Sequence, residues 1–391
     1  MIFVPILWFF GVIAFVGVLL ATILAALLTA FIAYKIYKLL NRHEKSSKSG
    51  RRGFYAVTIV TIVLTVSIFV GSFVVIGNVM NWMSELGIMD DYLVYPESEQ
   101  WTVWNQFHPF RYNTRTVSAD FEPYITISDN FPRLDGATAF LPVYSAVAET
   151  LFTGLDEYSV HPYVRLSTTR QAFTRLMQGQ TDIIFTLQPS QAQVEDAQSR
   201  GVTFIKTPIF REAFVFFVND INPVTSLTVE QIQQIYAGVI TNWSSVGGHN
   251  ERIVAYQRNP NSGSQTIMEQ VVMDGLTMVA PATELRQGDM GIMLRSVAQY
   301  TNHRQALGYS FRFYATVMNP QDGLRVLGID GIEPTPENIA NGSYPFTVYV
   351  YAITTAQGLE NPNTQKVIDW LLSEQGQLLI EKAGYIGLTN P

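Results

Sequence analysis

Residues 258–266 combine a guanidinium group with a glycine-centred run of hydroxyl side chains, in the order Arg-Asn-Pro-Asn-Ser-Gly-Ser-Gln-Thr. An apolar pattern with helical spacing follows, so Ser262, Gly263 and Ser264 are expected at the start of a helix. A helix start carries unpaired N–H groups and the positive end of the dipole, and glycine lets its backbone approach an anion closely. With Arg258 as the charge partner, these residues indicate a binding site for a small oxyanion. The alternative is a Ser-rich helix cap beside a solvated arginine.

Three earlier segments share a feature with this one: their hydroxyl residues lie where a loop meets a predicted helix or strand. Thr138 precedes an apolar helical pattern in residues 143–147, which leaves its hydroxyl and amide near a helix start. Residues 167–169, Ser-Thr-Thr, precede a further amphipathic pattern and on their own predict a helix cap. Thr186 ends an apolar, strand-like run, and ligands of open α/β sheets gather outside the carboxyl ends of strands.

The elements that would position these residues follow an alternating pattern from residue 131 onward. Apolar strand-like runs occur at 181–185, 214–218 and 252–256, and amphipathic helical patterns at 229–236 and 365–372. This alternation predicts an α/β fold with mainly parallel sheets. About 260 residues exceed what one compact core usually holds, so two lobes are expected.

Two long uncharged stretches lie before this region. The first 34 residues carry no charged side chain, and residues 53–84 form a second uncharged stretch. Each exceeds the roughly 20 residues that a membrane-spanning helix requires, so two transmembrane helices are predicted at about 3–34 and 54–80. Residues 35–52 hold seven Lys and Arg against one Glu, which places this loop in the cytoplasm by the positive-inside rule. A cleaved signal peptide is the alternative, but no basic residue precedes the first apolar run.

The charge balance and the missing residue types exclude several classes of function. Residues 82–391 carry 18 Lys and Arg against 31 Asp and Glu, so nucleic acid and anionic membrane surfaces are poor partners. The chain has no cysteine, and its five histidines show no metal-ligand spacing. Walker and dinucleotide motifs are absent as well. We therefore expect no catalytic residue, no metal site and no cofactor.

Several short motifs, taken in order, resemble a known family over residues 131–391. They are Asp-Gly-Ala-Thr-Ala at 135–139, Gly-Val-Ile-Thr-Asn-Trp-Ser-Ser-Val-Gly-Gly at 238–248, Arg258 with Ser-Gly-Ser at 262–264, Gly-Gln at 376–377 and Ala-Gly-Tyr at 383–385. The chain is similar to the phosphate-binding proteins that serve high-affinity phosphate ABC importers. The resemblance implies a two-lobed fold of the type II periplasmic-binding-protein kind, and it does not extend to residues 1–120.

The resemblance also implies a ligand pocket. Carried over position by position, the pocket residues are Thr138, Ala139, Ser167, Thr168, Thr169, Thr186, Arg258, Ser262, Gly263 and Ser264. Two positions depart from the family pattern. Leu187 stands where a carboxylate normally accepts a proton from the bound phosphate, and Pro260 stands where an acid normally pairs with the pocket arginine. A site carboxylate that meets no phosphate proton is left as an unpaired buried polar group, at a cost of about 1–3 kcal/mol, and this cost disfavours fully deprotonated oxyanions. Without the carboxylate, this discrimination is weaker.

These expectations define a multi-pass membrane protein with an extracytoplasmic C-terminal region. A stalk is expected at 85–130, lobe one at 131–213 together with 345–391, and lobe two at 214–344, with chain crossings near 214–219 and 342–345. The expected function is capture of a small oxyanion, with phosphate favoured, for an ABC permease. A membrane-bound sensor that relays anion binding to a partner is the alternative. A phosphate-ester hydrolase is a third reading, which lacks an evident nucleophile or metal set.

Overall fold

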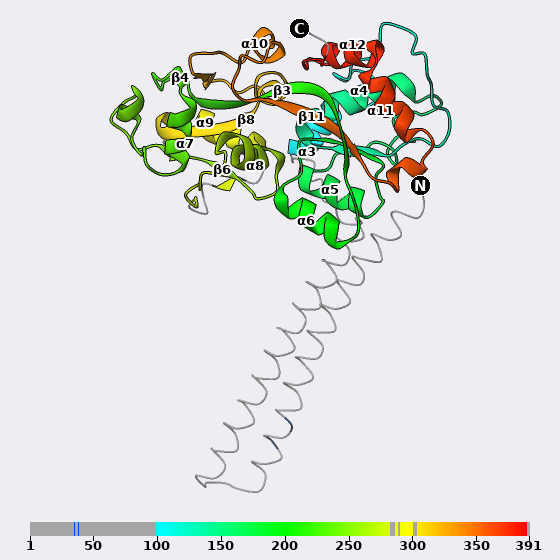
Figure 1. Cartoon of the computed structure of the whole chain (residues 1–391), viewed down its shortest axis with the longest axis horizontal. Coiled ribbons are helices and arrows are strands. Elements are labelled where there is room, and N and C mark those ends of the chain that lie inside the picture. The colour runs from blue at the N-terminus through cyan, green and yellow to red at the C-terminus, as the bar shows by residue number, and fades with distance from the viewer. Residues whose placement is uncertain are drawn as a thin grey trace. The chain divides into compact units, whose positions relative to one another are not determined.

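The computed structural model divides the chain into two compact units, Met1–Val94 and Tyr95–Pro391. It describes residues 99–281, 286–287, 290–299 and 303–388, together with Lys35 and Lys38 (Figure 1). The transmembrane helices predicted at about 3–34 and 54–80 lie outside the described residues. Within the described ranges, no helix is long and apolar enough to span a bilayer.

Helices surround a central sheet in the second unit. The α-helices are α3 (Glu99–Gln106), α4 (Leu141–Leu151), α5 (Thr169–Met177), α6 (Gln191–Ser199), α7 (Val229–Tyr236), α8 (Gly263–Ile267), α9 (Met290–Gln299), α10 (Pro336–Ala340), α11 (Thr364–Leu372) and α12 (Glu374–Lys382). Shorter helical turns are η1 (Thr138–Phe140), η2 (Trp243–Val246), η3 (Met268–Val272), η5 (His303–Gln305), η6 (Tyr314–Met318) and η7 (Gly358–Glu360). The helix predicted at 229–236 is α7, and the one predicted at 365–372 lies within α11.

The strands form one large sheet and two small ones. They are β1 (Leu134–Gly136), β2 (Ile183–Thr186), β3 (Ile205–Asn219), β4 (Ser226–Leu227), β5 (Val254–Ala255), β6 (Gln257–Arg258), β7 (Arg286–Gln287), β8 (Ala306–Phe311), β9 (Leu324–Val326), β10 (Gly328–Ile329) and β11 (Thr347–Thr354). The large sheet has the order β1-β2-β11-β3-β8-β5, and β9 pairs with β3. Strands β4 and β10 pair with each other, as do β6 and β7.

The large sheet is mixed, so the prediction of mainly parallel sheets was wrong. Strands β1 and β2 pair in parallel, as do β5 and β8. Strand β11, however, runs antiparallel to both β2 and β3, and β3 runs antiparallel to β8 and β9. The cause is that the chain returns late in the sequence to insert β11 between two earlier strands, a long-range pairing that local hydrophobic patterns do not encode.

Strand β3 connects the two halves of the sheet. Its residues up to Ala213 pair with β11, whereas residues from Phe214 onward pair with β8. Figure 1 shows α7, α8 and α9 at one end of this long strand and α4, α5, α11 and α12 at the other. The change of partner falls where the sequence predicts a crossing between lobes. The lobe boundaries themselves stay a prediction, and lobe one and lobe two keep the residue ranges given above.

The hydrophobic core runs through the sheet and includes part of the predicted stalk. All side chains from Ala213 to Val218 are buried, because helices cover both faces of the sheet here. Within 99–130, Val103, Phe107 and Ile127 belong to the same core cluster. The Ile127 N–H donates to the Leu151 carbonyl at 2.7 Å, so this segment is tied to the end of α4.

Candidate functional site

The turn after β1 carries Thr138 and Ala139 at the carboxyl end of the strand. The Ala137 N–H donates to the Phe185 carbonyl at 2.9 Å, which joins the ends of β1 and β2. A Cβ atom on Gly136 would lie 2.4 Å from the Phe185 carbonyl oxygen, so only glycine permits this close approach. Thr138 begins η1, and the Ala139 carbonyl accepts a hydrogen bond from the Tyr385 hydroxyl.

The three hydroxyl residues before α5 have three different environments. Thr168 is the N-cap of α5 in a capping box with Gln171, and its side chain is exposed. Ser167 donates both its N–H and its hydroxyl hydrogen to the Asp135 carboxylate. Thr169 is buried, and its Oγ1 lies 3.0 Å from the position that a Cβ on Gly263 would occupy. Of the three, Thr169 faces the start of α8.

The start of α8 approaches the start of α5 and the residue after β2 at Gly263. Ser262 is the N-cap of α8, and its Oγ accepts from the Gln265 N–H at 3.3 Å. Besides Thr169, the Cδ1 of Leu187 lies 3.4 Å from the position of a Cβ on Gly263. The start of α5, the residue after β2 and the start of α8 therefore converge on one point. Because helix α8 continues directly into η3, its dipole is that of a longer helical segment.

Arg258 ends β6 beside this point and is 7% exposed. Its backbone N–H donates to the Gln265 Oε1 at 3.0 Å and to the Tyr309 hydroxyl oxygen at 2.9 Å. The Tyr309 hydroxyl in turn donates to the same Gln265 oxygen. Burial raises the pKa of Tyr309 above its usual range, so the hydroxyl stays protonated and remains a donor. Arg258 is thereby fixed to the same helical segment as Ser262, Gly263 and Ser264.

Thr186 ends β2 with a buried hydroxyl. Its Oγ1 has no hydrogen-bond partner among the residues that the structure describes. Side chains alternate between the faces of a strand, so Thr186 shares a face with Ile184, which packs against Ala172 and Phe173 of α5. A buried hydroxyl without a partner is unfavourable by about 1–3 kcal/mol, and a ligand acceptor near the α5 start would relieve it.

Further hydrogen bonds join the loop that follows β2 to the loop that follows β6 and to η3. The Ser190 hydroxyl donates to the Asn261 Oδ1 at 2.8 Å, and the Gln270 amide donates to the Pro189 carbonyl at 3.3 Å. Asn261 adopts a left-handed backbone conformation with φ of 63°, which asparagine tolerates better than most residues. None of these four residues is among the predicted site residues. The Asn-Pro-Asn turn was the available signal, but it does not specify the partner.

The structure thus brings most of the predicted site residues into two connected groups. Thr169 and Gly263 meet directly, and Arg258 and Ser262 are linked through Gln265. Thr138, Ala139 and Thr186 lie at the joined carboxyl ends of β1 and β2. Thr168 is a helix cap and Ser167 is engaged by Asp135. The ligand role of all ten residues stays a prediction.

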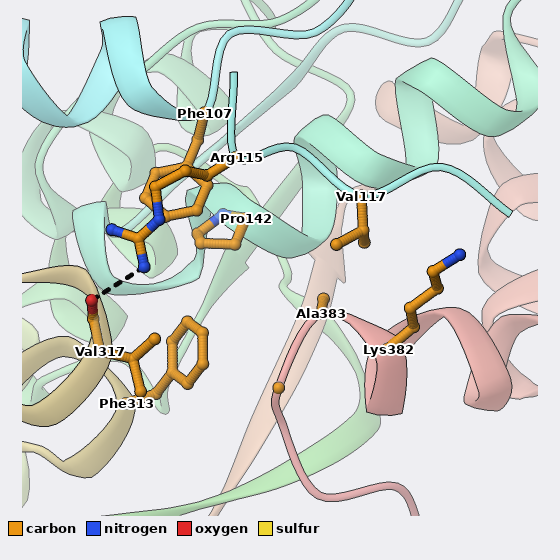
Figure 2. A pocket seen from close by; sticks show the side chains of 9 residues that line it. Phe107, Arg115, Val117, Pro142, Phe313, Val317, Lys382 and Ala383 are labelled. Atoms are coloured by element: carbon orange, nitrogen blue, oxygen red, sulfur yellow. Dashed lines mark hydrogen bonds between the residues drawn. The ribbon is translucent and has the colours of Figure 1, made fainter. Parts of the chain in front are cut away.

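A cavity of about 210 Å³ lies elsewhere in the unit (Figure 2). Its lining comes from the predicted stalk, the start of α4, η6 and the end of α12: Phe107, Arg115, Val117, Pro142, Phe313, Val317, Lys382, Ala383 and Gly384. Figure 2 shows the Arg115 guanidinium donating to the Val317 carbonyl, a bond of 2.9 Å. None of the ten predicted site residues lines this cavity, so it is separate from the candidate anion site.

Comparisons with known proteins agree with this architecture. A family model described as a PBP superfamily domain matches residues 132–375. The phosphate-binding protein PstS of Bacillus subtilis is 23% identical over 261 residues, which cover 66% of this chain and 80% of that protein. Protein SphX of Synechococcus elongatus is 25% identical over 267 residues, which cover 65% of this chain and 76% of that protein.

A solved structure shows the same relationship. A protein from Clostridium perfringens, described as a phosphate ABC transporter substrate-binding protein, was crystallised with bound phosphate. It has 25% sequence identity and a TM-score of 0.51, and the match covers 66% of this chain and 98% of that chain. The shared part is the α/β region that carries the candidate site.

Proposed function

The chain belongs to the PBP superfamily, and from this premise we propose that it is a solute-binding protein that captures a small oxyanion, with phosphate the favoured ligand. The observation that carries the proposal is the meeting of the α5 and α8 starts at Gly263, beside Arg258. The PstS protein of Bacillus subtilis and the Clostridium perfringens protein with bound phosphate support the choice of ligand.

For this function, hydrogen-bond donors within the site must outweigh the repulsion of an anion by the net negative charge of the protein. Residues 82–391 carry 31 acidic against 18 basic side chains, so the summed field repels an anion. Charge-assisted hydrogen bonds contribute about 1.5–3 kcal/mol each, and about 8 kcal/mol corresponds to micromolar affinity. A handful of such bonds from Arg258, the hydroxyls of Thr138, Thr169 and Ser264, and the Gly263 amide would therefore suffice.

Isothermal titration of the full-length protein in detergent tests the proposal. Phosphate is expected to bind in the micromolar range, and a neutral sugar is expected not to bind. Sulfate tests selectivity, because Leu187 replaces the carboxylate that would accept a phosphate proton. Equal affinity for sulfate and phosphate would show that the site binds small oxyanions without a preference for a protonated one. Failure of both anions to bind would refute the proposed function.

The role of the arginine has its own test. Arg258→Ala is expected to weaken phosphate binding about 10- to 100-fold, because a charge-assisted hydrogen bond of about 1.5–3 kcal/mol is lost. Arg200→Ala is a matched control, because Arg200 is exposed and bonds to Asp196 on α6. Wild-type affinity in Arg258→Ala would remove the arginine from the site.

We propose further that the apolar stretches at 3–34 and 54–80 anchor the protein in the membrane, with the binding region on the extracytoplasmic face, and that it delivers its ligand to an ABC permease. Resistance of the protein to extraction from membranes by alkaline carbonate tests the anchor. Co-purification from cross-linked membranes tests the partner. Recovery of a histidine kinase in place of a permease would favour the sensor function.

A further inference from the structure

Asp135 is a fully buried carboxylate three residues before the predicted ligand residue Thr138. It lies in the middle of β1 and is 0% exposed. Its carboxylate accepts three hydrogen bonds, from the Gly136 N–H at 2.7 Å, from the Ser167 N–H at 2.9 Å and from the Ser167 hydroxyl at 2.7 Å. An isolated buried carboxylate is strongly unfavourable, so each of the three hydrogen bonds offsets part of the cost of burying this charge.

The bonds to Asp135 join two turns that are far apart in sequence. One turn follows β1 and carries Thr138, and the other precedes α5 and carries Thr169. Asp135 is in register with Ile184, so its side chain lies on the face of the sheet that α5 covers. The hydroxyl hydrogen of Ser167 is committed to Asp135, so it is not available for an anion. Ser167 therefore connects the turn to the strand.

The charge of Asp135 is balanced within this region. Two buried groups interact electrostatically with it: Arg175 of α5, whose charge favours the ionised carboxylate, and Tyr144 of α4. Burial raises the pKa of Asp135 to about 6, although the Ser167 hydroxyl, the charge of Arg175 and the backbone N–H groups oppose the shift. The carboxylate is therefore ionised at neutral pH and becomes protonated in mildly acidic solution.

We propose that Asp135 is a positioning residue for anion binding: its ionised carboxylate holds the turn of Ser167 against the end of β1 and so fixes the spacing between Thr169 and Thr138. The inference rests on the proposed function. The three donors that point at Asp135 all find an acceptor in the ionised form, which carries no hydrogen of its own on the carboxylate. Neutralising Asp135 would loosen the turn and weaken anion binding.

The test compares Asp135→Asn with the wild type by titration of the full-length protein with phosphate from pH 5 to pH 8. At pH 8 the variant is expected to bind about 10- to 100-fold more weakly, because charge-assisted hydrogen bonds are lost. At pH 5 the wild-type carboxylate is itself protonated, so the ratio of the two affinities is expected to approach one. Phosphate titrates identically in both experiments, so its own ionisation cancels in this ratio.

Asp182→Asn is the matched control, since Asp182 is a buried carboxylate at the opposite end of the same strand pair and bonds to Arg133. Its affinity ratio to wild type is expected to stay near one at every pH. A purely structural role for Asp135 would instead give a loss that does not vary with pH. That result, or tighter binding by Asp135→Asn at pH 8, would overturn the inference.

A second variant tests the same inference if Asp135→Asn does not fold. Ser167→Ala keeps the N–H bond to Asp135 and removes only the hydroxyl, so a loss of about three- to tenfold is expected, confined to pH above about 6. Wild-type affinity in Ser167→Ala at pH 8 would contradict the inference. If the wild type binds no anion, the proposed function fails; if it binds and these variants match it, only the positioning role fails.

Discussion

The β1–β2 pair has two buried aspartates, Asp135 in β1 near the carboxyl end of the pair and Asp182 just before its amino end, and the two are compensated in different ways. Near the carboxyl end, Asp135 accepts hydrogen bonds from the N–H groups of Gly136 and Ser167 and from the Ser167 hydroxyl, and the charge of the buried Arg175 also favours its ionised form. At the amino end, Asp182 accepts from the backbone N–H of Arg133 at 2.8 Å and from its guanidinium at 3.0 and 2.6 Å. Asp182 is hydrogen-bonded directly to a guanidinium, whereas the hydrogen bonds named for Asp135 come from neutral groups.

We interpret this difference as a distinction between a structural end of the strand pair and the end that lies next to the predicted ligand residues. The ion pair at Asp182 holds the start of β2 to the residue before β1. Asp135 sits where the chain turns toward the predicted ligand residues, and its bonds act on the geometry of those turns. We therefore expect substitutions at the carboxyl end to change anion binding, and substitutions at the amino end to change stability without changing anion binding.

The largest expected effect is at the junction of α5 and α8. Gly263→Leu places a side chain against Thr169 and Leu187, where even a Cβ would lie 3.0 Å from the Thr169 Oγ1. We expect loss of phosphate affinity by at least about 100-fold in titration calorimetry, because an overpacked contact costs about 1–3 kcal/mol and the donors also move apart. Gly263→Ala should give an intermediate loss. Equal affinities for wild type, Ala and Leu would show that the two helix starts do not form the site.

The next effect concerns the dependence of stability on pH. The pKa of Asp135 is raised by burial from 3.8 to about 6, so the folded state binds a proton more tightly than the unfolded state. Between about pH 4 and 6 the unfolded chain ionises first, and the free energy of unfolding therefore falls as pH rises, by about 3 kcal/mol in total. Asp135→Asn lacks this contribution.

Denaturant titration at pH 4, 5, 6 and 7.5 measures this difference, because the other groups titrate equally in both proteins. The wild type should lose stability relative to Asp135→Asn as the pH rises through this window. A constant difference between the two proteins would contradict the raised pKa. The comparison between the two aspartates would then lose its electrostatic basis, although the hydrogen bonds to Ser167 would remain.

Local features of the fold could be predicted from the sequence. Helix α7 spans the predicted residues 229–236, since Thr228 and Gln231 form a capping box ahead of an amphipathic pattern. The predicted helix starts at Thr168 and Ser262 are likewise N-caps. The strand directions in the large sheet were not predictable in the same way. They depend on the insertion of β11 beside β3, and no local pattern records that pairing.

The same limit applies to the candidate site. Hydroxyl and glycine residues at helix starts were recognised because each start is encoded within a few positions. Asp135 lies inside a recognised motif, but its partner Ser167 is 32 residues away. Tyr385 supports Ala139 across 246 residues, and Tyr309 supports Arg258 across 51. Such supporting contacts depend on tertiary structure, so the sequence indicated candidate donors without the groups that hold them.

The smallest expected effect is at the amino end of the strand pair. Arg133→Ala leaves the buried carboxylate of Asp182 without its guanidinium partner, although the backbone N–H bond remains. A fully buried pair that is broken costs about 3–5 kcal/mol, but the Arg133 side chain is 38% exposed, so we expect about 2 kcal/mol in denaturant unfolding. Phosphate affinity should stay within about twofold of wild type, because the strand end that carries Thr138 and Thr186 is untouched. A loss of affinity comparable to that of Asp135→Asn would mean that the two ends of the strand pair act as one unit, and the distinction between them would fail.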